Sequence, residues 1–294
     1  MARATAKATA LLLSAAVAFS GCNASYFSRK MMDSRMEASA TPFQKTDRAK
    51  ELALSFRAVR AVPGIEYLMG SLPGQCMLYD LARMGNENRG VSFGDAALRM
   101  FSRLSSIKSY FDSAYAKASN EPASGALMEL ERAAYAYSCA VGKMGMKYGK
   151  TSRFIDAFAC AKGDTVHADC DVTGIIFIWL AQSKGINAGG LMGWDSTDFS
   201  RGAHFLVAVP GKGGRPTYTV STTLLLRQSA RERPPGKTPD SERFGISTQR
   251  AYADRAEHKF PGFTFWYFKP GEEINYYLGT QPLFFDKFDL PRIL

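Results

Sequence analysis

The stretch that decides the fold runs from Asp169 to Gly185 and reads DCDVTGIIFIWLAQSKG. Residues 171–184 of this stretch predict a helix whose apolar side chains lie nearly all round its axis. A helix with that pattern is buried on most sides and does not lie on a surface. Gly185 follows at the position where glycine commonly ends a helix. We therefore expect this helix at the centre of the hydrophobic core.

Strand-like runs follow the central helix. They are predicted at residues 186–193, 203–209, 217–222 and 263–268. The turn-forming sequence GKGG at 211–214 lies between the second and third runs, which is typical of a hairpin. The last run, FTFWYF, could form a carbohydrate platform, but alternating aromatic residues in a strand belong more often to the core.

The residues before the central helix have helical patterns. Helices are predicted from Asp47 until Pro63 and at 75–84, 93–117, 123–148 and 152–161, and one more at 248–258. Residues 231–242 are charged and rich in proline, which favours an exposed loop. The predicted fold class is α+β, with a helical region at 47–149 packed on an α+β domain at 150–294.

The first residues have the pattern of an export signal. Arg3 and Lys7 precede an uncharged apolar run at 8–19, which is too short to span a bilayer of about 30 Å. The run ends in FSGC, which resembles the lipobox of bacterial lipoproteins, with Cys22 as the lipidated residue. We expect a signal peptide at 1–21, a polar tether at 22–46 and a lipid-anchored protein of the cell envelope, facing the periplasm or the exterior. The alternative is an ordinary cleaved signal with a chance cysteine.

The formal net charge is +10, and the basic residues are scattered along the chain. They could favour anionic surfaces such as lipid headgroups or cell-wall polymers, although a solvated basic surface is the simpler interpretation. They form no nucleic-acid motif, and export argues against that partner. The expected partners are a peptide or peptidoglycan-like substrate and, through the lipid on Cys22, a membrane.

Cys170 stands at the start of the central helix, where unpaired N–H groups and the positive end of the helix dipole favour thiolate over thiol. The same N–H groups can hold the oxyanion of a tetrahedral intermediate. A reactive thiol needs a base, and the chain has three histidines. His204 opens an apolar strand, from which its imidazole could face the thiol.

The order of these residues resembles the transglutaminase-like, or papain-like, cysteine superfamily. The matching residues are Asp169-Cys170-Asp171, Leu180, Gly185-Ile186-Asn187-Ala188, Gly202-Ala203-His204 and Tyr218-Thr219-Val220-Ser221-Thr222-Thr223. The likeness covers about a quarter of the chain, from Arg153 to Thr223. It implies a buried nucleophile helix packed on an antiparallel sheet, and acyl transfer from amides through a thioester without a cofactor or metal.

The resemblance also shows one departure. The residue that orients the histidine is usually an aspartate in this superfamily, and the matching position here is Ser221. A serine hydroxyl can accept the imidazole N–H, but it stabilises an imidazolium less than a carboxylate does. Three interpretations remain open: another acid such as Asp195 or Asp198 takes the role, the alignment is shifted, or the activity is weakened or lost.

Other interpretations of the cysteines and histidines compete with this one. Cys170 could be a buried structural thiol, or His167, Cys170 and His204 could bind zinc, although a fourth ligand is missing. Cell-wall hydrolases that open a helix with DCSG match less well, because DVTG follows Cys170 directly here and the Gly-Ile pair comes too late. Cys76, Cys139 and Cys160 remain for a disulfide whose pairing stays open. The two functional hypotheses are a cysteine hydrolase or acyl transferase, and a catalytically impaired binding or scaffolding module.

Overall fold

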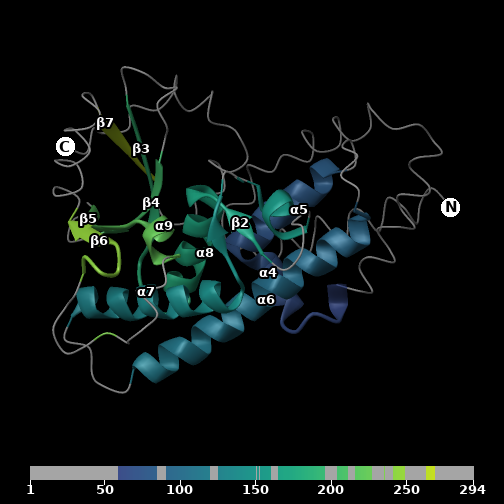
Figure 1. The fold of residues 1–294 in the computed structure, drawn as a ribbon, viewed down its shortest axis with the longest axis horizontal. Helices are drawn as coiled ribbons and strands as arrows, with labels where there is room; N and C mark the ends of the chain where they lie inside the picture. The colour runs from purple at the N-terminus through teal and green to yellow at the C-terminus, as the bar shows by residue number, and fades with distance from the viewer. Residues whose placement is uncertain are drawn as a thin grey trace.

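The computed structural model describes residues 59–84, 91–119, 125–149, 151, 153–159, 165–195, 204–210, 216–226, 235, 241–248 and 263–268, with the backbone alone at 82–84, 193–195, 216–217 and 263–267. The fold is a mixed α+β arrangement in which helices come first and a later helix packs against an antiparallel sheet (Figure 1). The predicted α+β class is therefore confirmed at this level.

Among the described residues, four labelled helices precede the central one. They are α4 (Ile65–Gly70), α5 (Leu72–Met84), α6 (Phe93–Ala118) and α7 (Ala126–Lys143). Helix α6 begins at an N-cap, because the Ser92 hydroxyl accepts the Asp95 N–H at 3.1 Å. The helix predicted at 123–148 ends earlier, since Lys147 donates its N–H to Val166 O at 2.8 Å and joins a strand instead.

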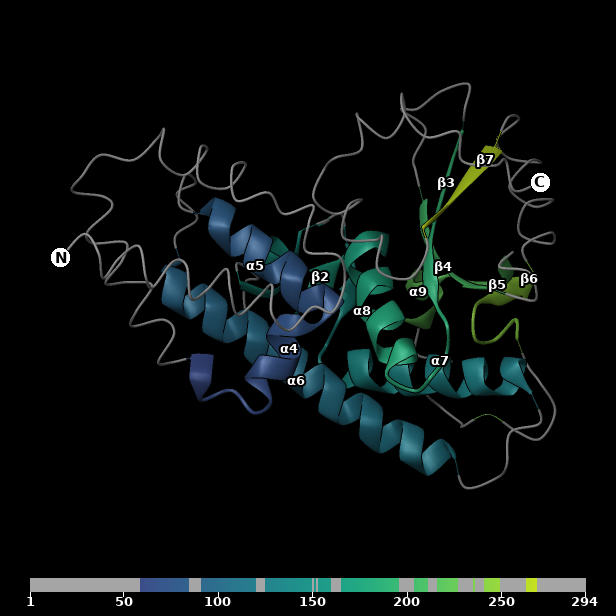
Figure 2. The same ribbon diagram turned by 180° about the vertical axis from the view of Figure 1, so that it is seen from behind.

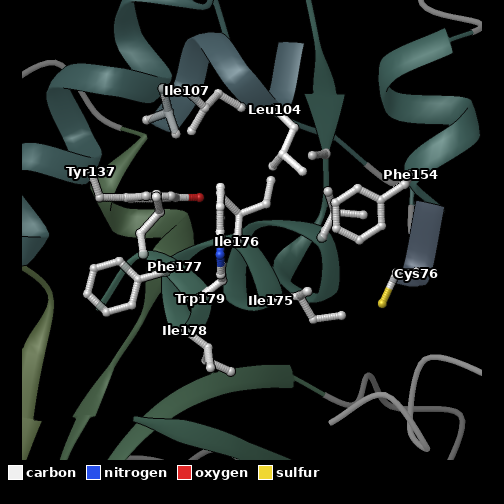
Figure 3. Close-up of a cluster of buried hydrophobic side chains, with 14 of the residues drawn as sticks. Cys76, Leu104, Ile107, Tyr137, Phe154, Ile175, Ile176, Phe177, Ile178 and Trp179 are labelled. Carbon is white, nitrogen blue, oxygen red and sulfur yellow. The ribbon is translucent and has the colours of Figure 1, made fainter. Parts of the chain in front are cut away.

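The central helix is α8 (Cys170–Gln182), capped by Asp169, whose carboxylate accepts the N–H of Asp171 at 3.0 Å and of Val172 at 3.4 Å. All residues from 172 to 181 are buried, as predicted. Figure 3 shows apolar side chains of α8 meeting side chains from α5, α6 and α7. One such contact places the Tyr137 ring edge-on to Phe177, with centroids 5.2 Å apart. Gly185 adopts φ of 77° just after the helix, which confirms the predicted stop.

The main sheet has five strands in the order β6-β5-β4-β3-β7, and every neighbouring pair is antiparallel. In chain order the strands are β3 (Gly189–Asp195), β4 (His204–Pro210), β5 (Pro216–Val220), β6 (Ile246–Thr248) and β7 (Phe263–Phe268). Strand β7 has the predicted bounds, whereas β5 ends at Val220, before a short helix α9 (Thr222–Leu225). Thr248 belongs to β6 and not to the predicted helix at 248–258, the rest of which lies outside the described residues.

A second, two-stranded sheet leads into α8. Strand β1 (Lys147–Tyr148) pairs in parallel with β2 (His167–Ala168). Between them, the predicted short helix appears as a π-helical turn, η2 (Ile155–Ala159). Its last carbonyls accept from α6: Arg103 Nη1 donates to Phe158 O at 2.7 Å, and Arg99 Nη1 donates to Ala159 O at 3.3 Å.

Helix α8 lies between the sheet on one side and helices α4 and α5 on the other, with α7 running past its end (Figures 1 and 2). One hydrophobic cluster continues from the helices through α8 into β4 and β5. Helix and sheet approach closely at Gly174, where a Cβ atom would lie 2.5 Å from Phe205 Cδ1. A side chain at this position would push α8 away from β4.

Several predicted features lie outside the described residues: the signal peptide, Cys22, the tether, and most of the helix from Asp47 and of the loop at 231–242. Among the helices that the structure describes, none combines the length and apolar character that crossing a membrane requires.

Candidate functional site

Cys170 is the first residue of α8 and lies against the start of β4. Its side chain is 9% exposed, and its thiol is free. The sulfur accepts the backbone N–H of Phe205 at 3.4 Å, and the thiol donates to Asp171 Oδ1 at 3.6 Å. The nucleophile candidate is therefore held directly beside the strand that begins with His204.

The prediction that the helix N-terminus favours the Cys170 thiolate is wrong. Burial raises the pKa of the Cys170 thiol far above its ordinary value, and the negative charges of Asp171 and Asp169 raise it further, while the Phe205 N–H lowers it only in part. The N–H groups of the first turn are also partly used, because the Asp169 carboxylate accepts those of Asp171 and Val172. The resting form at neutral pH is therefore the thiol.

His204 is the first residue of β4 and is half-buried. Its Nε2 lies 3.5 Å from Ser221 Oγ, and this hydroxyl lies 3.1 Å from Thr223 Oγ1. If Nε2 donates to Ser221, Nδ1 keeps a lone pair that can accept a proton. Burial lowers the pKa of His204, so the imidazole is neutral near pH 7.

The structure brings His204 and Ser221 together and places Cys170 against Phe205, the residue after His204. Within the described part of the chain, the Cys170 thiol and the His204 imidazole form no hydrogen bond with each other, and Phe205 N is the group that links their elements. Ser221, which is 8% exposed, is the group that the structure places on the imidazole. Asp195 ends β3 with its side chain outside the description, and Asp198 lies outside it entirely.

A pair of buried threonines connects the two sides of the site. Thr173 Oγ1 lies 2.9 Å from Thr222 Oγ1 and donates to Asp169 O at 2.7 Å. Thr173 belongs to the first turn of α8, and Thr222 opens α9 directly after Ser221. This contact therefore fixes the distance between the helix that carries Cys170 and the turn that carries Ser221.

The structure bears on two other interpretations of the cysteines and histidines, a zinc site and a disulfide. In the described residues, the one group of three possible metal ligands is Asp169, Cys170 and Asp171, with ligand atoms within 4.8 Å of one another, and it contains no histidine. A zinc site of His167, Cys170 and His204 thus gains no support. Of the cysteines proposed for a disulfide, Cys76 is buried in α5, Cys139 is half-buried in α7, and Cys160 lies outside the described residues.

The sequence did not single out four groups that shape the site: Thr173, Thr222, the Phe205 N–H and Tyr148. The two threonines meet across 49 positions of the chain, and a backbone N–H has no sequence signature. Tyr148 lies in a strand of two residues, which is too short for any periodicity to reveal.

Comparison of the chain with protein-family models, with curated proteins and with solved structures finds no match. The chemistry of this chain must therefore be argued from its own geometry.

Proposed function

We propose that this chain is a transglutaminase-like thiol hydrolase or acyl transferase of the bacterial cell envelope, in which Cys170 attacks an amide carbonyl. The observation that carries the proposal is the meeting of three elements: a free thiol at the start of α8, an imidazole at the start of β4, and a hydroxyl on that imidazole from the end of β5. A buried helix against consecutive antiparallel strands is also the arrangement that the family resemblance implies.

The reaction follows from the protonation states of the site. The thiol turns from Phe205 N towards the imidazole, and His204 Nδ1 takes its proton as sulfur bonds to the carbonyl carbon. The imidazolium then gives that proton to the leaving amine as the C–N bond breaks, which leaves a thioester on Cys170. Water or a second amine then attacks the thioester while His204 takes a proton from it; the C–S bond breaks, the acid or new amide leaves, and the imidazolium returns the proton to the sulfur.

The proposed substrates are amide bonds in peptides or peptidoglycan-like polymers. This part of the proposal depends on the export signal and on lipid attachment at Cys22, which would place the site at the cell envelope. The basic composition of the chain suits contact with anionic envelope polymers.

The decisive experiment is acylation by p-nitrophenyl acetate, followed by peptide mass mapping. We expect a release of p-nitrophenolate equal to the protein concentration, with the acetyl group on Cys170. The Cys170→Ala variant should lose this release, and Cys139→Ala, which alters another incompletely buried cysteine, should keep it. Acetylation of Cys170 no faster than that of Cys139 would contradict the proposal.

A second function, a catalytically impaired binding module, is favoured by two observations: Ser221 occupies the position of the orienting acid, and Cys170 is buried. The Ser221→Asp variant distinguishes the catalytic function from the binding function. A carboxylate 3 to 4 Å from Nε2 stabilises the imidazolium, and we expect acylation of Cys170 to accelerate about tenfold, at a rate measured by p-nitrophenolate release. Thr223→Asp, a neighbouring hydroxyl substitution, serves as the control. If wild type is inert and Ser221→Asp is active, the chain is an impaired relative and functions by binding.

A further inference from the structure

Tyr148 lies on the strand that runs alongside the approach to Cys170. Strand β1 pairs with β2 so that Tyr148 is opposite Ala168. The pairing continues past the strand ends, because Gly149 N donates to Ala168 O at 3.0 Å and Asp169 N donates to Thr151 O at 3.1 Å. The segment that carries Tyr148 is therefore fixed to the chain up to the residue before Cys170.

Strand alternation places Tyr148 on the same side as the thiol. Side chains of successive extended residues point to opposite faces. Asp169 is extended, with φ of −88° and ψ of −168°, so Cys170 shares a face with Ala168 and with its partner Tyr148. His167 lies on the other face, together with Gly149, where a Cβ atom would be 2.8 Å from His167 Cβ. Cys170 comes two residues after Ala168, the partner of Tyr148. Two extended residues span about 7 Å, and a tyrosine side chain is long enough to cover that distance.

The surroundings of the Tyr148 phenol agree with this position. The side chain is 59% exposed, so it borders solvent beside a thiol that is itself buried. Partial burial raises the pKa of Tyr148, and electrostatic interaction with nearby Cys170, Asp169 and Asp171 raises it further. The phenol therefore stays protonated and can donate a hydrogen bond.

An oxyanion formed beside the Cys170 thiol needs hydrogen-bond donors, and the backbone offers one of them. An oxyanion that forms on the substrate carbonyl is usually held by two donors. The Cys170 N–H has no acceptor in the described residues, so it is one such donor. The next two N–H groups of α8 already donate to Asp169 Oδ1. A second donor can come from a side chain on the segment next to Cys170, and Tyr148 lies there.

We propose that Tyr148 supplies this second donor, and that its O–H hydrogen-bonds the carbonyl oxygen of the amide that Cys170 attacks. The inference rests on the proposed acyl transfer and adds a catalytic residue to it. As the carbonyl carbon becomes tetrahedral, negative charge develops on its oxygen, and the neutral phenol stabilises that charge without giving up its proton.

The test compares two reactions of the same thiol in the full chain and in Tyr148→Phe. Acylation by p-nitrophenyl acetate passes through an oxyanion, whereas alkylation by iodoacetamide displaces iodide at a saturated carbon and forms none. We expect Tyr148→Phe to slow acylation about a hundredfold and to leave the alkylation rate within about twofold of wild type. The control is Tyr67→Phe, a tyrosine of α4 that is 54% exposed.

The outcomes separate this inference from the proposal beneath it. Acylation of Tyr148→Phe at the wild-type rate would overturn the role of the tyrosine alone. A parallel fall of acylation and alkylation would overturn it as well, since the phenol would then act on the thiol and not on the oxyanion. A wild-type protein that is never acylated at Cys170 would overturn the acyl-transfer proposal itself.

Discussion

The His204→Ala variant is expected to be acylated at Cys170 about a thousandfold more slowly than wild type at pH 7. The reason is the pKa of the Cys170 thiol, which burial and two neighbouring carboxylates raise far above its ordinary value. Such a thiol hardly ionises on its own near neutral pH. Attack therefore needs a base that removes its proton, and we propose the imidazole of His204, the residue before Phe205, whose N–H contacts the sulfur.

The pH dependence of p-nitrophenolate release measures the same effect with a defined sign. Burial lowers the pKa of His204 from its ordinary value of 6.5. The imidazole becomes neutral, and thus a base, as pH rises through this lowered pKa. The acid limb of the wild-type profile should accordingly have its midpoint below pH 6.5. In His204→Ala the rate should instead climb steadily with pH as the thiol ionises directly.

His167→Ala is the matched control, because this exposed histidine lies three positions before Cys170 and faces away from it. It should keep both the rate and the acid limb of wild type. Equal rates for His204→Ala and wild type would contradict the general-base role of His204, and an acid limb above pH 6.5 would contradict a neutral buried imidazole.

The Gly174→Ala variant is expected to lower the free energy of unfolding by about 3 kcal/mol. The added Cβ would lie 2.5 Å from Phe205 Cδ1 and 2.7 Å from Cε1, and Phe205 is completely buried. Helix α8 and strand β4 cannot move apart easily, because residues 172 to 181 of α8 are all buried. Urea unfolding followed by circular dichroism measures the loss. Because any shift separates Phe205 N from the sulfur, acylation of Cys170 should slow as well.

Two further variants show whether the clash with Phe205 is the cause. Gly185→Ala adds a Cβ in open space at a positive φ and should cost only about 1 kcal/mol. In a Phe205→Val background the ring is gone, and Gly174→Ala should then stabilise by about 0.5 to 1 kcal/mol, because alanine is the better helix residue. An equal loss in both backgrounds would mean that Phe205 is not what excludes a side chain at this position.

The elements with strong local patterns could be predicted from the sequence. The apolar run of α8 and the stop at Gly185 predicted the buried helix, and the alternating aromatic residues predicted β7 with its bounds. The α+β class followed from these elements. The short elements could not be predicted, because strands of two residues such as β1 and β2 exist only through pairing with each other.

Part of the candidate site could likewise be predicted from the sequence. Cys170, His204 and Ser221 stand in a recognisable order, and the fold brings the last two within 3.5 Å. The protonation state of Cys170 was mispredicted, because the helix terminus was weighed without burial and without the charges of Asp169 and Asp171. The burial of this first helical residue depends on the elements that pack against the helix end, and the sequence around Cys170 does not report it.

The burial of Cys170 between two carboxylates has a consequence for its chemical survival. Peroxide and disulfide exchange act on thiolates, and a thiol held in its protonated form is a poor target for both. If the chain is exported, as we propose, it works where oxidants prevail and reducing partners are scarce, and an accessible thiolate there would be converted to sulfenic acid or a mixed disulfide. In the acyl transfer that we propose, the arrangement around Cys170 would keep the sulfur a protonated thiol at rest, and it would become nucleophilic only while His204 holds its proton.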